Sequence, residues 1–178
     1  MAVQISYTFL INGDRYALIG MAGGDLALSK QFGMEPKELP FANHGGFYGM
    51  YELTPVGLYL RGLDRNDENG YYLPIEGIDP AKDIDQATYD DRSVLIPFTG
   101  KIRLAKDFIN QPRVNVAYQK ALAFKTVFDI TLKEGQVVGV KDRSWEMEQK
   151  RVAIKDCCRF PDKLERILDA FSLDLDLE

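Results

Sequence analysis

Apolar and polar residues alternate along much of this chain with the two-residue period of a β-strand, and the first such segment is the clearest. In residues 3–11 the odd-numbered positions are apolar, whereas the even-numbered positions include the polar Gln4, Ser6 and Thr8. Asn12-Gly13 then supplies residues that tolerate the positive φ angles of a tight turn, and residues 15–19 return as a second strand. The pattern predicts an amino-terminal β-hairpin.

Further apolar segments predict that most of the chain is β-structure. The expected strands are residues 46–53, 58–61, 71–75, 93–98, 102–108, 122–132 and 136–141. Thr54-Pro55 joins the first two of these, Glu134-Gly135 joins the last two, and the acidic segment 79–91 is expected to be a loop. About nine strands in an antiparallel meander are enough for a barrel or a sandwich, which is the predicted fold class.

Helical patterns are few and lie mainly near the carboxyl end. Residues 161–171 carry apolar side chains at helical spacing after Pro161, so we expect a helical cap over an open end of the sheet. Residues 25–32 suit a short helix capped by Asp25. Within residues 144–158 the pattern suits a helix at first, while residues 151–154 also suit a strand. A length of 178 residues predicts one β-rich domain over residues 1–178.

The sequence predicts a protein without a membrane span that resides in a reducing compartment. No apolar run approaches the roughly 20 residues needed to cross a bilayer, and residues 1–7 lack the basic and apolar regions of a secretory signal. Cys157 and Cys158 are adjacent, which would strain a disulfide between them. We therefore expect reduced, structural thiols in a cytoplasmic protein.

The charge is unevenly distributed along the chain. The net charge is −5, yet residues 101–151 hold 11 Lys and Arg against 6 Asp and Glu, a local net charge of +5. Lys101 and Arg103 share one face of an expected strand, and that face is either solvated or suited to an acidic partner. The overall acidity argues against nucleic-acid binding.

Signs of catalysis are sparse. His44, the one histidine, lies beside Gly45-Gly46 and is a candidate general base that Glu52 or Glu76 would orient. A surface histidine is the alternative interpretation. The sequence has no nucleophile elbow, no complete phosphate loop and no dense set of metal ligands, so we expect neither a cofactor nor a metal.

Tyrosine and arginine, which are common at the energetic centres of interfaces, gather in the middle of the chain. Adjacent tyrosines on a strand point to opposite faces, so one side chain of such a pair lies outside the core. The alternative is that these aromatic residues pack inside a barrel. The candidate partner-binding residues are Arg61, Asp64, Arg65, Asp67, Glu68, Tyr71 and Tyr72.

Three short motifs resemble an uncharacterised group of small bacterial β-rich proteins. The motifs are Phe47-Tyr48-Gly49-Met50, Tyr51-Glu52-Leu53 and Leu58-Tyr59-Leu60, and the first hairpin and Phe98-Thr99-Gly100 fit the same pattern. The group has Arg within the first motif and Trp in the second, where this chain has other residues. The resemblance spans most of the chain and implies a compact β fold, without an activity to transfer.

These features lead to three functional hypotheses. The first is a binding protein that occludes another macromolecule, in the manner of an immunity protein or inhibitor, with a protein as its partner. The second is a β-barrel that binds a small ligand. The third is an enzyme that uses His44 with a nearby carboxylate.

Overall fold

The computed structural model describes residues 7–23, 26, 47–65, 72–83, 87–109 and 121–156. These residues form a mainly β structure with a single α-helix. The strands are β1 (Thr8–Ile11), β2 (Asp14–Gly23), β3 (Phe47–Thr54), β4 (Gly57–Arg65), β5 (Ala81–Lys82), β6 (Ala87–Tyr89), β7 (Val94–Leu95), β8 (Gly100–Phe108), β9 (Phe124–Lys133) and β10 (Gln136–Asp142). The helical elements are the 3₁₀ turn η1 (Ala121–Ala123) and the helix α2 (Ser144–Asp156).

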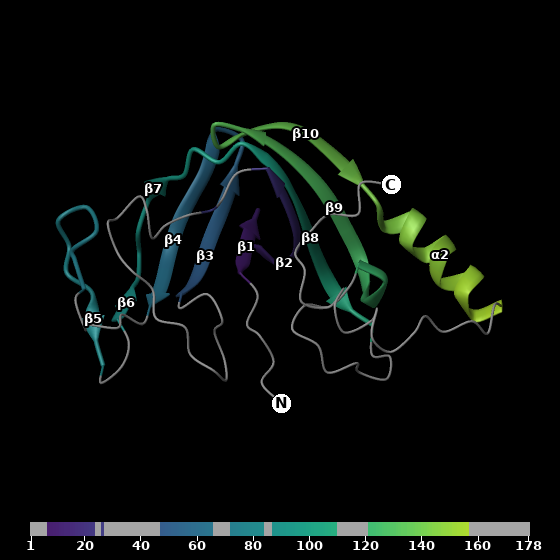
Figure 1. Cartoon of the computed structure of the whole chain (residues 1–178), viewed down its shortest axis with the longest axis horizontal. Coiled ribbons are helices and arrows are strands. Elements are labelled where there is room, and N and C mark those ends of the chain that lie inside the picture. The colour runs from purple at the N-terminus through teal and green to yellow at the C-terminus, as the bar shows by residue number, and fades with distance from the viewer. Residues whose placement is uncertain are drawn as a thin grey trace.

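All ten strands belong to one strongly curved sheet. Its order is β10-β9-β8-β2-β1-β3-β4-β6-β5, and β7 pairs separately with β4. Figure 1 shows the strands as an arch, with β5 and β6 at one end and β10 with α2 at the other. Within the described residues β10 and β5 do not pair, so the sheet is open and the predicted barrel is not confirmed.

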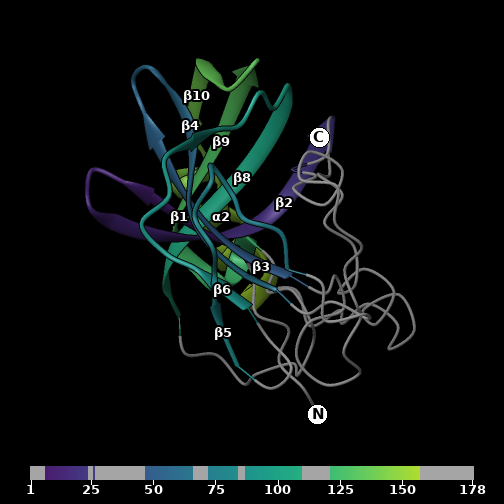
Figure 2. The ribbon, with the colours of Figure 1, turned by 90° about the vertical axis from the view of Figure 1, so that its left-hand side faces the viewer.

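Local turn chemistry explains the two hairpins that the sequence predicts most clearly. Asn12 and Gly13 have φ angles of 51° and 84°, and Glu134 and Gly135 have φ angles of 50° and 81°. Positive φ at both central residues defines the hairpin turn that matches the twist of paired strands. The predicted β1–β2 and β9–β10 hairpins are therefore confirmed, and Figure 2 shows the first turn projecting from one side of the sheet.

One strand pair makes the sheet mixed rather than a purely antiparallel meander. Strand β1 pairs in parallel with β3, with Phe9 opposite Tyr51. The rings of these two residues stack with their centres 5.0 Å apart. The expected meander is wrong at this point, because a buried contact between distant segments has no local sequence signal.

Two segments differ from their predicted conformations. The acidic segment 79–91 is not simply a loop, since it contains β5 and β6, and β6 pairs with the end of β4. Residues 72–74 are not in a strand, and Ile75 pairs only with Ile78 across a two-residue turn. Pro74 lacks the backbone N–H that a strand ladder would need there.

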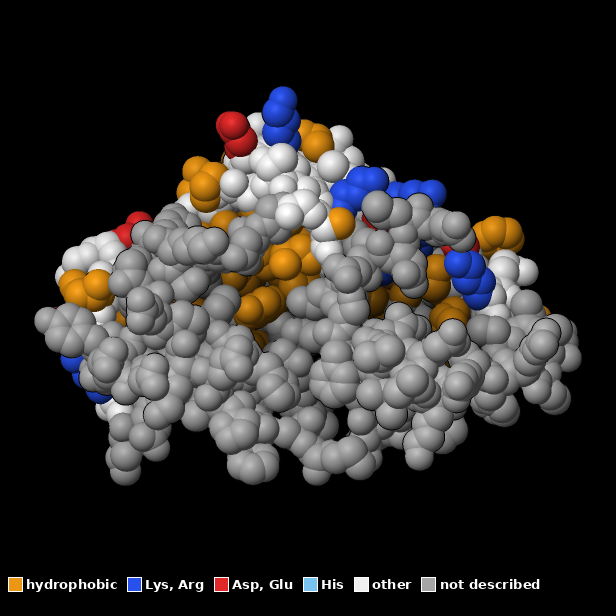
Figure 3. Space-filling model, viewed as in Figure 1, with side chains coloured by type: hydrophobic (Ala, Val, Ile, Leu, Met, Phe, Trp, Pro, Cys, Tyr) orange, Lys and Arg blue, Asp and Glu red, His pale blue; other side chains and the backbone are white. Residues whose placement is uncertain are grey.

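The main hydrophobic core covers one side of the sheet, which we call the inner face; the opposite side is the outer face. Its largest fully buried side chains include Phe9, Tyr51, Tyr89, Leu58 and Ile102. Figure 3 shows apolar side chains gathered beneath the arch. These residues alternate with polar neighbours along their strands, as expected for a sheet with one buried side.

Helix α2 covers a smaller core at the other end of the sheet. Met147 of α2 is buried with Val127, Phe124 and Ala105 of β8 and β9. Arg151 continues the helix and donates from Nη1 to the Phe124 carbonyl at 2.8 Å. Residues 151–154, for which the sequence suited either a helix or a strand, are therefore helical.

Other predictions fall outside the described residues. These are the helices at residues 25–32 and 161–171, and the thiols of Cys157 and Cys158. Leu26 alone is described in the first of these segments, and it is buried in the main core.

Candidate functional site

Strand β4 divides the predicted partner-binding residues between the two faces of the sheet. A bulge at Arg61 shifts the register between β3 and β4, so that Leu60 pairs with Tyr51 while Gly62 pairs with Met50. Past the bulge, Asp64 lies on the outer face. Arg65 lies on the inner face and is only 2% exposed, so it does not form an accessible contact surface.

Of the remaining predicted partner-binding residues, the structure describes only Tyr72. Tyr72 is partly buried and packs against the main core. Asp67, Glu68 and Tyr71 lie outside the described residues.

Arg61 is held in place by three neighbours on the outer face. Its Nε donates to Glu52 Oε2 at 2.5 Å, and its Nη2 completes an ion pair with the same oxygen. Its Nη1 donates to Ser93 Oγ at 3.0 Å and to the Arg92 carbonyl at 3.4 Å. The side chain nevertheless remains 37% exposed, so its orientation is fixed while its surface stays accessible.

The Tyr59 ring lies beside this guanidinium, and the exposed Leu95 is the cross-strand neighbour of Tyr59. The guanidinium carbon of Arg61 lies 5.7 Å from the centre of the Tyr59 ring. Leu95 of β7 is opposite Tyr59 and is 49% exposed, and Val56 in the preceding turn is 67% exposed. Together Glu52, Tyr59, Arg61 and Leu95 form what we call the Tyr59–Arg61 patch.

The sequence contained a partial signal for this patch. The predicted turn at Thr54-Pro55 joins the two strands that carry Glu52 and Tyr59, and in the structure these two residues lie opposite each other. Leu95 could not be found in this way, because β7 reaches β4 through a non-consecutive pairing. The bulge that places Arg61 on the outer face and Arg65 on the inner face also has no signature in the local sequence.

Of the three candidate catalytic residues, the structure describes Glu52 and Glu76. Glu52 is engaged by Arg61. Glu76 is exposed in the Ile75–Ile78 turn, with a φ angle of 52°. His44 lies outside the described residues, so its relation to either carboxylate stays a prediction.

The basic segment forms a second feature of the outer face. Lys101 pairs with Thr131 and Arg103 with Asp129, which agrees with the expected common face of Lys101 and Arg103. Lys141 of β10 is opposite Asp129 from the other side. Figure 3 shows Lys and Arg side chains above this part of the arch.

Arg103 itself is committed to an internal ion-pair network. Its Nε and Nη2 donate to the two carboxylate oxygens of Asp129 at 2.6 and 2.9 Å, and Arg143 Nε donates to Asp129 at 3.0 Å. Arg143 also donates to Glu146 of α2. Burial raises the pKa of Asp129, but Arg103 and then Arg143 outweigh this effect and hold that pKa below its ordinary value.

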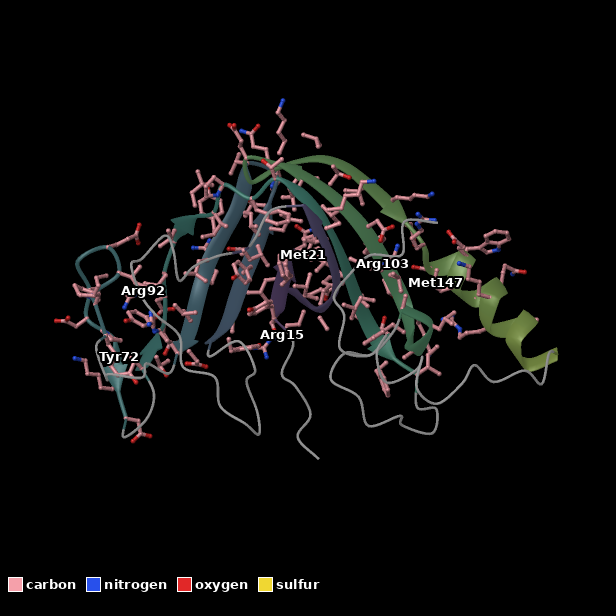
Figure 4. The ribbon with its side chains drawn as sticks, in the orientation of Figure 1. Arg15, Met21, Tyr72, Arg92, Arg103 and Met147 are labelled. Carbon is pink, nitrogen blue, oxygen red and sulfur yellow. The ribbon has the colours of Figure 1, made fainter. Side chains whose placement is uncertain are left out.

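The exposed lysines near this network are better placed to meet a partner than Arg103. Lys101, Lys133 and Lys141 are exposed, and none joins an ion pair among the described residues. Figure 4 shows Arg103 and Met147 near the α2 end of the sheet and Arg92 and Tyr72 near the opposite end. The outer face is thus basic at one end and carries the Tyr59–Arg61 patch toward the other.

The described residues contain neither a metal-binding cluster nor a membrane-spanning helix. No group of three or more His, Cys, Asp or Glu side chains there has the arrangement of a metal site. In the same part of the chain, no helix combines the length and apolar character required to cross a bilayer.

Comparisons of the whole chain with protein-family models, with curated proteins and with solved structures found no match.

Proposed function

We propose that this protein binds another protein through the outer face of its sheet and acts by occluding that partner. The observation that carries the proposal is the partly exposed Arg61, which Glu52 and Ser93 orient beside Tyr59, with the exposed Leu95 opposite Tyr59. Tyrosine and arginine dominate many interface hot spots, and apolar neighbours exclude water around them.

Preorganisation supports a binding role for this patch. A free arginine side chain loses considerable rotamer freedom when a partner immobilises it, and that loss weakens binding. Arg61 is already held by a carboxylate, a hydroxyl and a carbonyl. Its remaining exposed surface meets a partner at a smaller entropic cost.

Charge supports an acidic protein surface as the partner. The exposed Lys101, Lys133 and Lys141 lie on the same sheet as the patch, and they would steer an acidic surface toward it. The chain as a whole has a net charge of −5, which supports a protein partner over a nucleic acid. The two adjacent cysteines are consistent with a cytoplasmic setting.

The proposal is tested by affinity capture from a lysate of the source cells, followed by native mass spectrometry. Arg61→Ala removes the central side chain of the patch, whereas Arg15→Ala removes an exposed arginine of the same sheet outside the patch. We expect the wild-type protein and Arg15→Ala to retain one stoichiometric protein that Arg61→Ala loses. Equal retention by both variants, with circular dichroism spectra unchanged, would exclude the patch as the binding site.

A further inference from the structure

Arg92 contributes its backbone carbonyl to the contacts of Arg61, but its buried side chain takes no part in the proposed outer-face function. It lies between β6 and β7 and is 6% exposed. Its backbone N–H donates to the Arg61 carbonyl at 2.9 Å. Its guanidinium carbon lies 5.9 Å from the centre of the Tyr89 ring, and Tyr89 is fully buried.

The Tyr89 ring is itself fixed by a hydrogen bond. Its hydroxyl donates to the Leu73 carbonyl at 2.8 Å, which ties β6 to residues 72–74. The ring therefore offers Arg92 a rigid aromatic surface. Figure 4 shows Arg92 at the β5–β6 end of the sheet, together with Tyr72.

The guanidinium of Arg92 has incomplete electrostatic compensation. Among the described residues, Nε of Arg92 is buried without a hydrogen-bond acceptor, and no carboxylate forms an ion pair with this side chain. Arginine stays protonated in proteins, so the charge cannot be relieved by loss of a proton. A cation–π contact recovers only part of the cost of burying such a charge.

A second buried guanidinium lies on the neighbouring strand. Arg65 pairs with Ala87, and Leu63 pairs with Tyr89, so Arg65 and Tyr89 are diagonal neighbours on the inner face. Arg65 is 2% exposed. Arg65 makes interactions of its own, so Arg92 is the buried guanidinium whose charge favours a negative group nearby.

We propose that Arg92, placed over Tyr89, binds a small oxyanion group, either a carboxylate or a phosphate. The planar guanidinium matches both groups, because its parallel N–H donors meet two oxygens at once. The Tyr89 ring lies against one side of this guanidinium. This site is separate from the Tyr59–Arg61 patch, which lies on the opposite face of the sheet.

The experiment follows the Nε–Hε resonance of Arg92 by ¹H–¹⁵N NMR while inorganic phosphate or succinate is added at constant ionic strength, with chloride as the reference. The resonance is assigned by its absence in Arg92→Gln. We expect a saturable shift with phosphate or with succinate that chloride does not produce. The more effective anion identifies the oxyanion class, and no shift with either anion would overturn the proposal.

Thermal unfolding supplies an independent measurement with a matched control. We expect the same anion to raise the Tm of the wild-type protein and of Arg15→Gln, which changes an exposed arginine. Arg92→Gln should weaken the apparent anion affinity about tenfold or more. An equal rise in Tm for Arg92→Gln would mean adventitious anion binding only and would also overturn the proposal. If Arg92→Gln does not fold, the Arg92 Nε–Hε resonance of the wild-type protein is assigned through its correlations with neighbouring side chains. The NMR titration then tests the proposal without the variant.

Discussion

Arg61 Nε donates to Glu52 Oε2 at 2.5 Å across the β3–β4 hairpin, and this bond fixes the direction of the central side chain of the patch. We predict that Glu52→Gln weakens partner binding because Arg61 loses its charged anchor. Stability should change by about 1 kcal/mol or less, since partly exposed ion pairs contribute little to folding. Urea unfolding measures the change in stability, and titration with the partner measures the change in affinity. A large loss of stability, or undiminished affinity, would contradict this role of Glu52.

Asp129 links β8 and β9 to the segment that begins α2. In Asp129→Asn, Arg103 and Arg143 would lose their shared counter-charge while remaining mostly buried. We expect a loss of about 2–4 kcal/mol in the free energy of unfolding. Asp14→Asn is the control, because Asp14 is largely exposed in its ion pair with Lys106. Equal urea midpoints for the two variants would show that the Asp129 network does not stabilise the fold.

The same network predicts a dependence of stability on pH. The pKa of Asp129 is lower in the folded protein than its ordinary value of 3.8, so its ionised form stabilises the fold. This contribution is complete above the ordinary pKa and is lost as the pH falls from that value through the lowered one. We expect the Tm of the wild-type protein to fall over this acidic range more steeply than that of Asp129→Asn. Parallel Tm profiles would contradict the prediction.

Two strands approach closely at Gly100 and Gly23. A Cβ atom at Gly100 would lie 2.3 Å from the Ala22 carbonyl oxygen and 2.9 Å from the Phe98 ring. Gly100→Ala should therefore cost more than about 2 kcal/mol of stability, because backbone atoms must move. Gly13→Ala should cost only about 1 kcal/mol, since Gly13 has open space around it and a φ angle of 84°. Denaturant unfolding of both variants checks this order, and a larger loss for Gly13→Ala would refute it.

The parts of the fold that were predictable are those fixed by neighbouring residues. Asn12-Gly13 and Glu134-Gly135 determine their hairpins through backbone conformation, so the turns were found in the sequence. The pairing of β6 with β4 was missed because residues 79–91 lack the apolar alternation of a strand. Strand β6 forms because its backbone can pair with the edge of β4, and this pairing has no signal in the local sequence.

The candidate site was predicted only in part for a similar reason. Arg61 and Arg65 have the same residue type and both belong to β4, yet one is accessible and the other is buried. Simple alternation places them on one face, whereas the bulge at Arg61 separates them. An extra residue in one strand reverses the side-chain pattern beyond it, and nothing in the local composition announces this change.

The most direct test of the outer-face account is the affinity of the captured partner for two variants, measured by isothermal titration calorimetry. Leu95→Asp places a charge within the Tyr59–Arg61 patch, and Val138→Asp makes the same change at an exposed valine of β10. We predict that Leu95→Asp weakens binding by about a hundredfold, while Val138→Asp leaves the affinity within about twofold of the wild-type value. Equal affinities for both variants would show that the partner binds elsewhere on the protein.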